Sequence, residues 1–360
     1  MSGAGEREVP RGPSRGARPR IAVVGAGLVG RRHADAVLAS GAAELSCIVD
    51  PAPAGRAFAA GIGAPWRMAL DELLEEDRPD GVILATPNAA HFDGAMACIA
   101  AGLPTLVEKP ICDDLADARA LVEAAEAASV PLLTGHHRRH NPLISAAKAS
   151  LEAGEVGRIL AVTAMFWLRK PDGYFETEWR RREGAGPVHL NLSHDIDLLR
   201  WLVGEVETVV AMEARIARGH GAEDTATALL RFANGALGTV TISDAIPAPW
   251  SWEMTSGENP AYPQTDQSCY LIGGERGALD LPRNRLWRHE GPEQSWWAPI
   301  AARVAPVPQA DPLVRQAKHF AEVIRGDAVP LVSGREGLRT LEVVDAIKRA
   351  AGSGGAVQLG

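Results

Sequence analysis

A short apolar run followed by three spaced glycines constrains this chain more than any other feature. The segment from Arg20 to Gly30 reads RIAVVGAGLVG, and its first part, Ile21 to Val24, is apolar and largely β-branched. Such a run is typical of a central parallel strand. The stretch from Leu28 to about Ala39 is compatible with a helix and ends at Ser40-Gly41. The glycines therefore lie at a predicted strand-to-helix turn.

These glycines, Gly25, Gly27 and Gly30, have the spacing of a dinucleotide-binding motif. Glycine at such positions allows a tight turn, close approach of the backbone to a pyrophosphate, and close contact between helix and strand. The first N–H groups of the helix, around Leu28 and Val29, would then bind phosphate oxygens. We therefore expect a nucleotide at this turn, and a glycine turn without a ligand is the less favoured alternative.

The end of the next predicted strand, Leu45 to Val49, indicates which dinucleotide binds. The strand is followed by Asp50, about 20 residues after Gly30, where an acidic side chain bonds the ribose hydroxyls of NAD. NADP favours an arginine beside that position, and the nearest one, Arg56, lies about one predicted helical turn further on. NAD is therefore the expected cofactor, and NADP is less favoured.

Predicted strands and helices continue to alternate after Asp50. The strands cover 81–85, 104–107 and 130–134, and the helices between them cover 89–101 and 114–128. This order predicts an α/β fold with a doubly wound parallel sheet, whose ligands bind at the carboxyl ends of the strands. Those ends carry the polar sequences ATPN with a following histidine, EKP, and GHHRRH. Cofactor contacts are expected from Thr86, Pro87, Asn88, His91, Glu108 and Lys109.

A predicted helix in the second half of the chain carries a candidate base. Its apolar stripe consists of Leu192, Ile196, Leu199 and Val203, and His194 lies on the opposite face. That face is also partly apolar, which favours a neutral imidazole able to accept a proton from an alcohol. On these residues alone, a satisfied core histidine is the commoner explanation.

Composition limits the class of protein and its partners. The 360 residues suffice for two domains, and 46% apolar with 23% charged residues is typical of globular proteins. The net charge of -8 argues against nucleic acid, and no apolar run is long enough to span a membrane. The four cysteines stand far apart, which favours unpaired thiols in a reducing, cytoplasmic compartment. Residues 1–18 are predicted to be a disordered tail, and a signal peptide is the disfavoured alternative.

In their order and spacing, the motifs resemble the Gfo/Idh/MocA family of NAD(P)-dependent sugar and polyol dehydrogenases. The landmarks are GAGLVG (25–30), ATPNAAH (85–91), EKP (108–110), RRHNP (138–142), GPVHLNLSHDID (186–197) and GREGLRTLE (334–342). The resemblance implies an NAD-binding Rossmann domain over 19–137. It also implies an α/β domain over 138–360 with a large, mostly antiparallel sheet, whose open face would form a homodimer or homotetramer. The helices expected at 311–325 and 334–351 carry no chemistry.

The resemblance further implies a function and two catalytic residues. Lys109 would contact the substrate hydroxyl, next to a cis bond to Pro110, and His194 aligns with the catalytic base of the family. The expected reaction is hydride transfer, without a metal, between nicotinamide and a secondary alcohol or ketone of a cyclic polyol, sugar or glycoside. The alternatives are a dihydrodiol dehydrogenase, an enzyme that oxidises a glycoside transiently, and an NAD(H)-binding regulator.

One departure from the family pattern concerns the substrate site. Many members have an aspartate four residues before the histidine, where this chain has Leu190. Asn191 could contact the substrate in its place, and Asp197 is a candidate partner for His194 or Lys109. The remaining candidate substrate contacts are Asp195, His137 and Trp252.

Two further segments have more than one interpretation. The aromatic segment 249–263, which contains Trp252, could bind a sugar ring, contact another subunit or fill the core. His136 and His140 have no nearby cysteine or carboxylate to complete a zinc site. A Trp-Arg pair, by resemblance, adds Arg180 as a cofactor contact.

Overall fold

The computed structural model describes residues 17–360. The chain divides into two compact units, one of residues up to 136 together with 313–338, the other of 137–312 together with 339–360. The boundary lies one residue before the predicted one, but residues 313–338 return to the first unit, although the prediction assigned them to the second. The tail predicted over 1–18 lies outside the described residues except for its last two.

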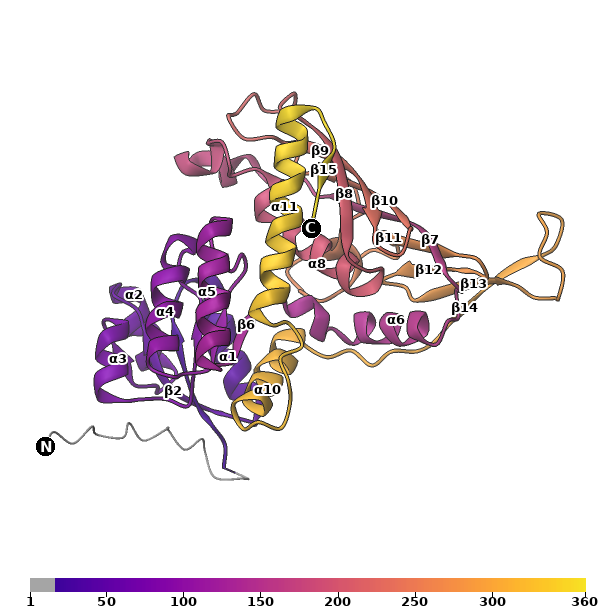
Figure 1. Ribbon diagram of the computed structural model, residues 1–360. Coiled ribbons are helices and arrows are strands. Elements are labelled where there is room, and N and C mark those ends of the chain that lie inside the picture. The colour runs from indigo at the N-terminus through magenta and orange to yellow at the C-terminus, as the bar shows by residue number, and fades with distance from the viewer. Residues whose placement is uncertain (1–16) are drawn as a thin grey trace, which may run out of the picture. The chain divides into compact units, whose positions relative to one another are not determined.

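The first unit contains a six-stranded sheet in which every pairing is parallel (Figure 1). Its strand order, β3-β2-β1-β4-β5-β6, reverses direction between β1 and β4, and ligands bind at such a switch point. This confirms the predicted doubly wound sheet. The strands are β1 (Arg20–Val24), β2 (Glu44–Val49), β3 (Trp66–Arg67), β4 (Gly81–Leu84), β5 (Thr105–Val107) and β6 (Leu132–Thr134).

The helices of this unit are α1 (Leu28–Ser40), α2 (Pro53–Gly61), α3 (Leu70–Glu76), α4 (His91–Ala100), α5 (Leu115–Ala128) and α10 (Pro312–Ile324). The apolar side of α10 joins the core of this unit, where Phe320 is buried with Ile21 and Ile83. That burial explains why the chain returns to the first sheet. Among residues 17–360, no helix is long and apolar enough to cross a membrane.

The second unit is built on a nine-stranded sheet with the order β14-β13-β12-β11-β7-β10-β9-β8-β15. Only β7 and β10 pair in parallel, so the sheet is mostly antiparallel as expected. The strands are β7 (Ile159–Trp167), β8 (Val206–Ala214), β9 (Thr225–Phe232), β10 (Leu237–Ser243), β11 (Tyr270–Gly274), β12 (Ala278–Leu281), β13 (Arg285–His289), β14 (Ile300–Val304) and β15 (Val357–Gln358).

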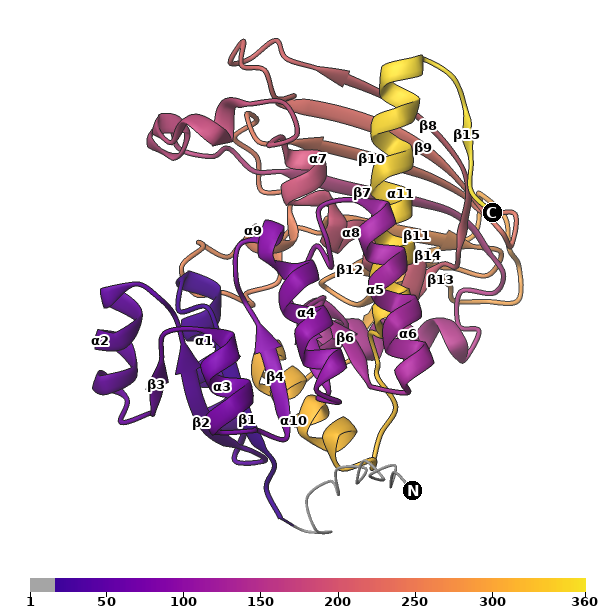
Figure 2. The same cartoon turned by 60° about the vertical axis from the view of Figure 1, so that its left-hand side comes forward.

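Helices cover one face of this sheet (Figure 2). Side chains of α8 and α11, such as Ile196 and Ile347, share one core with the strand residues Leu230, Val240 and Ile272. The helices of this unit are α6 (Pro142–Glu152), α7 (Pro187–Leu190), α8 (Leu192–Leu202), α9 (Trp252–Thr255) and α11 (Gly334–Ser353), of which α11 begins in the segment of the first unit.

The opposite face of the sheet carries exposed apolar side chains. Val210 pairs directly with Leu229, which pairs with Thr239, then Thr163 and finally Leu271 in one row across five strands. Directly paired residues lie on the same face, so this row belongs to a single surface. Leu229 is 54% exposed and Leu271 is 47% exposed. We call this surface the open face.

Candidate functional site

The turn between β1 and α1 has the geometry of a nucleotide-binding loop. Gly25 has a φ of +93°, which glycine adopts without strain, and a Cβ there would lie 2.4 Å from Ala85 O. A Cβ on Gly30 would lie 1.9 Å from Gly25 O. A Cβ on Gly27, in contrast, would meet no protein atom within 4 Å. The protein itself therefore requires the first and third glycines, whereas Gly27 leaves the backbone open to a ligand at the start of α1.

Asp50, at the end of β2, is fixed beside this turn. Its Oδ2 accepts a hydrogen bond from Ala26 N at 2.6 Å, and its Oδ1 accepts one from Ala52 N at 2.8 Å. Arg56 is turned to Trp66, with its guanidinium 5.2 Å from a ring centroid. The local charge near the expected ribose position is thus a carboxylate, which suits hydroxyl groups better than a phosphate.

A cavity of about 440 Å³ lies at the carboxyl ends of β1, β2, β4 and β5. Besides Ala85, all of its lining residues are ones that the sequence predicted to bind the cofactor: Gly25, Gly27, Leu28, Val29, Asp50, Thr86, Pro87, Asn88, His91, Glu108 and Lys109. Gly30 lies outside the lining because it packs against Gly25. Parallel strands bring their carboxyl ends to one edge, which explains why residues far apart in sequence meet here.

Two buried histidines hold the walls of this cavity. His33 of α1 lies 2.6 Å from Glu108 Oε1, measured from Nε2, and both side chains are nearly buried. The ring of His91 lies 2.8 Å from Pro110 O and 3.0 Å from Thr86 O, so it ties two cavity loops together. His91, a predicted cofactor contact, lines the cavity while both of its ring nitrogens are directed to the backbone. The Lys109–Pro110 bond is cis, as the resemblance implied.

In the second unit, His194 on α8 lies against His137. The two ring centroids are 5.0 Å apart and the ring planes are at 73°, an edge-to-face contact. His137 Nε2 lies 2.8 Å from Glu258 Oε1. Asn191 begins the same helix, and its Oδ1 is buried with no hydrogen-bond partner among residues 17–360. A buried acceptor without a partner is costly, so this atom is suited to a ligand donor.

The prediction that Asp197 binds substrate is wrong. Its two oxygens accept hydrogen bonds from Arg139 Nε at 2.9 Å and Arg139 Nη2 at 2.7 Å, and both side chains are buried. Thr340 Oγ1 donates an additional hydrogen bond to Asp197 Oδ1, at 3.3 Å. The carboxylate neutralises a buried guanidinium in the core and is therefore committed to structure rather than to His194 or Lys109.

Asp195 and Trp252 are also buried, each 1% exposed, and the predicted substrate contact of Trp252 is wrong. Asp195 Oδ2 has no hydrogen-bond partner among residues 17–360, so the predicted contact of Asp195 stays a prediction. Asp195 Oδ1 accepts hydrogen bonds from Tyr270 OH and Arg138 Nη1. Burial raises the pKa of this carboxyl to about 6, against the opposing effect of Arg138. Trp252 packs near Tyr270 in the core of the unit, which favours the core-filling interpretation for this residue.

The last two predictions concern Arg180 and metal binding. The Arg180 guanidinium lies 4.1 Å from the centroid of Tyr174 and donates a hydrogen bond to Tyr174 O at 2.9 Å. These contacts place it in a cation–π cluster of the second unit. No three histidine, cysteine or acidic side chains within residues 17–360 are grouped so that they could hold a metal ion.

Comparisons with known proteins agree with this architecture. Residues 19–136 match "Oxidoreductase family, NAD-binding Rossmann fold", and residues 144–280 match "GFO/IDH/MocA C-terminal domain". The rhizopine catabolism protein MocA of Rhizobium meliloti is 30% identical over 64% of this chain and 73% of its own length. The chain belongs to the Gfo/Idh/MocA family.

Other Gfo/Idh/MocA proteins match nearly the whole chain. The NAD(+)-dependent scyllo-inositol 2-dehydrogenase of Bacillus subtilis is 27% identical over 94% of this chain and 96% of its own. The solved structure of the WlbA dehydrogenase from Bordetella pertussis, in complex with NADH and UDP-GlcNAcA, is 30% identical with a TM-score of 0.77. The match covers 96% of this chain and 99% of the WlbA chain. This chain is accordingly an oxidoreductase, and its cofactor is NAD, which the open backbone at Gly27 and the carboxylate of Asp50 fit.

Three residues that support the candidate sites of this Gfo/Idh/MocA protein, His33, Arg139 and Glu258, were not among the predicted site residues. His33 had a detectable signal, because it follows Gly30 by three positions on the helix face that packs against the sheet. Arg139 and Glu258 had none. Their partners lie 58 and 121 residues away in the chain, beyond the reach of any local pattern.

Proposed function

We propose that this protein oxidises a secondary alcohol of a cyclic polyol, sugar or glycoside to a ketone, or reduces that ketone. The cavity at the ends of β1, β2, β4 and β5 carries the proposal, because all of the predicted cofactor residues except Gly30 and Arg180 line it, Lys109 among them. Relatives named for inositol and apiose dehydrogenation, and for 1,5-anhydro-D-fructose reduction, support the substrate class.

In this proposal, different residues of the cavity bind different parts of the dinucleotide. Gly25 and Gly30 shape the turn so that Gly27 and the first turn of α1 bind the pyrophosphate, and Asp50 binds the adenosine ribose. The loops after β4 and β5 supply the remaining contacts, from Thr86, Pro87, Asn88, His91 and Glu108. Arg180 remains a candidate cofactor contact on the resemblance alone.

Lys109 and His194 then perform the acid–base chemistry. His194 accepts the proton of the substrate hydroxyl as general base. The ammonium of Lys109 stabilises the negative charge that develops on that oxygen. NAD, when bound, would supply the acceptor for the hydride of the carbinol carbon. Asn191 and His137 are proposed to contact the substrate, and the unpartnered Oδ1 of Asn191 supports an accepting role toward a second hydroxyl.

The test is NADH formation over a panel of inositols, aldoses, glycosides and dihydrodiols. The proposal is supported if the enzyme turns over one polyol or sugar class. That turnover should fall by about 100-fold or more in both Lys109→Met and His194→Asn, while both variants still bind NADH. Turnover of dihydrodiols alone would indicate the dihydrodiol alternative. Cofactor that stays bound through a net redox-neutral reaction would indicate transient oxidation, and NADH binding without any turnover would indicate a regulator.

We also propose that two copies associate through the open face and that the protein works in the cytoplasm. The exposed apolar residues of the row across the sheet, Val210, Leu229 and Leu271, support the first point, because apolar patches on soluble proteins commonly mark interfaces. All four cysteines are free and buried, which supports a reducing compartment.

A further inference from the structure

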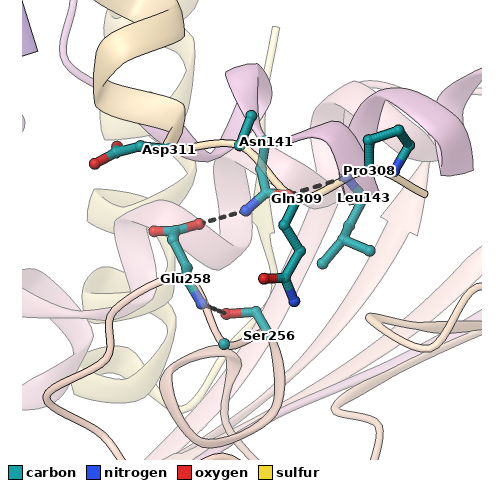
Figure 3. A pocket seen from close by; sticks show the side chains of 9 residues that line it. Asn141, Leu143, Ser256, Glu258, Pro308, Gln309 and Asp311 are labelled. Carbon is teal, nitrogen blue, oxygen red and sulfur yellow. Dashed lines mark hydrogen bonds between the residues drawn. The ribbon is translucent and has the colours of Figure 1, made fainter. Parts of the chain in front are cut away.

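The aromatic segment 249–263 holds an acidic residue in a defined position. Ser251 Oγ caps α9 by accepting from Met254 N at 3.3 Å, and Ser256 Oγ accepts from Glu258 N at 3.1 Å. Gly257 between them has a φ of +68°, and a Cβ there would lie 2.7 Å from the Gln264 side chain. These contacts define the conformation of the turn. Figure 3 shows the Glu258 side chain extending from the turn toward Asn141.

The carboxylate of Glu258 has three side-chain donors. Asn141 Nδ2 donates to Oε2 at 2.8 Å, Trp252 Nε1 donates to the same oxygen at 2.9 Å, and His137 Nε2 lies 2.8 Å from Oε1. Burial by itself raises the pKa of Glu258, but His137, Arg138 and the bond from Trp252 lower it to about 2. The side chain is only 9% exposed and is thus a buried anion at neutral pH.

This arrangement fixes both the proton and the ring of His137. An ionised carboxylate only accepts hydrogen bonds, so Nε2 of His137 must carry a proton, whether the ring is cationic or neutral. The ring so held packs edge-to-face against His194. One turn before His194, Leu190 offers an apolar side chain that cannot orient an imidazole. His137 is the neighbour whose own orientation is fixed by charge.

We propose that Glu258 is a positioning residue for the reaction, holding His137 in one tautomer and one ring orientation so that His137 sets the orientation of His194. The inference rests on the proposed function, because it takes His194 as the base. It also gives the segment 249–263 a role: Trp252 is buried there as a hydrogen-bond donor to Glu258 rather than as a platform for a sugar.

The decisive variant is Glu258→Gln. Asn141 and Trp252 both donate to one position, so the amide oxygen of the glutamine will turn to them and its NH₂ group will face His137 Nε2. The imidazole must then accept there and carry its proton on Nδ1. We expect ring-labelled histidine NMR to show this tautomer change and a shift of the His194 ring signals. We also expect kcat to fall about 10- to 100-fold, with the Kd for NADH unchanged.

A matched control and a coupling measurement accompany this variant. Glu253→Gln alters a carboxylate of the same segment that pairs with Arg138 at 2.6 Å, and it should leave both the His137 tautomer and kcat near wild type. His137→Phe keeps an aromatic edge beside His194 but ends the link, so Glu258→Gln added to it should cause no further loss of kcat. Additive losses would overturn the inference, because Glu258 would then act by another route.

The NMR measurement also separates this inference from the proposed function. If wild type turns over no substrate of the panel, the proposed function fails, yet the histidine signals still report on positioning. A His137 tautomer and a His194 signal that both stay unchanged in Glu258→Gln would overturn the inference whether or not the enzyme turns over. If Glu258→Gln does not fold, His137→Phe with unchanged His194 signals and wild-type kcat would overturn it.

Discussion

Arg139 donates two parallel hydrogen bonds to Asp197, from Nε and Nη2 at 2.9 and 2.7 Å, inside the core of the second domain. Asp197→Ala removes the carboxylate that neutralises this buried guanidinium, so we expect the free energy of unfolding to fall by about 3–5 kcal/mol. The Kd for NADH should not change, because the NAD cavity belongs to the first unit. Denaturant unfolding and a fluorescence titration measure the two quantities.

The double variant Arg139→Leu/Asp197→Leu tests whether removing both charges costs less stability than removing the carboxylate alone. Removing both charges leaves no buried ion without its counter-charge, and only the Thr340 hydroxyl loses an acceptor, so the loss should be much smaller than for Asp197→Ala. A stable Asp197→Ala protein with a raised KM for substrate would show that the carboxylate serves the substrate after all.

Asp50 should decide between NAD and NADP. Asp50→Ala removes an ionised acceptor worth about 1.5–3 kcal/mol, so the Kd for NADH should rise about 10- to 100-fold. The discrimination against NADPH should shrink at the same time, since no carboxylate then opposes the 2′-phosphate. Fluorescence titration with both cofactors measures this, and Asp35→Ala, an exposed aspartate of α1, is the control. An unchanged preference for NADH would exclude Asp50 as the selecting residue.

Glu258 should make stability depend on acidic pH. Its pKa falls on folding from 4.5 to about 2, so the folded state holds the proton less tightly than the unfolded state. This contribution, of the order of 3 kcal/mol, is fully present above pH 4.5 and is lost as the pH falls toward 2. The Tm difference between wild type and Glu258→Gln should therefore be largest near neutral pH and shrink on acidification. A difference that grows as the pH falls would contradict the assignment.

The open face should control association. Leu229→Glu brings like charges together where two copies meet, and the dissociation constant of the oligomer should rise by at least about 100-fold. Sedimentation velocity would then show a shift to monomer. Val329→Glu changes an apolar residue that is 83% exposed but lies in the first unit, and it should leave the oligomer intact. A monomeric wild type would refute the proposed association.

The four thiols should be inert in the folded protein. Burial raises the pKa of Cys47 to about 11 and those of Cys98 and Cys112 to about 12, and it raises that of Cys269 as well. Because the thiolate is the reactive form, Ellman's reagent at about pH 8 should modify less than one thiol per chain. All four should react in denaturant. Rapid modification of a native thiol would show that one of these sites opens.

The local elements of the fold were largely predictable. The predicted strand 81–85 is one residue longer than β4, and the predicted helix over Leu28 to about Ala39 is one residue shorter than α1. Some predicted boundaries differ from the observed ones. The α-helix expected from residue 89 begins at His91, because the residues before it, Asn88–Ala90, form a 3₁₀ turn. The strand expected at 130–134 is β6 at Leu132–Thr134, the three residues that pair with β5.

The sequence by itself determined the NAD site. A strand, a glycine turn and a helix are local features, and parallel strands must bring their carboxyl ends to one edge, so Asp50, Thr86 and Lys109 could be expected to meet. Only the tertiary structure decided which acidic residues of the second domain serve the core and which the candidate base. No local pattern in the sequence distinguishes Asp197 from Glu258, but a buried charge is stable only when it is paired with another charge or hydrogen-bonded. The partners, Arg139 and His137, are brought near by the fold of the whole domain rather than by any local spacing.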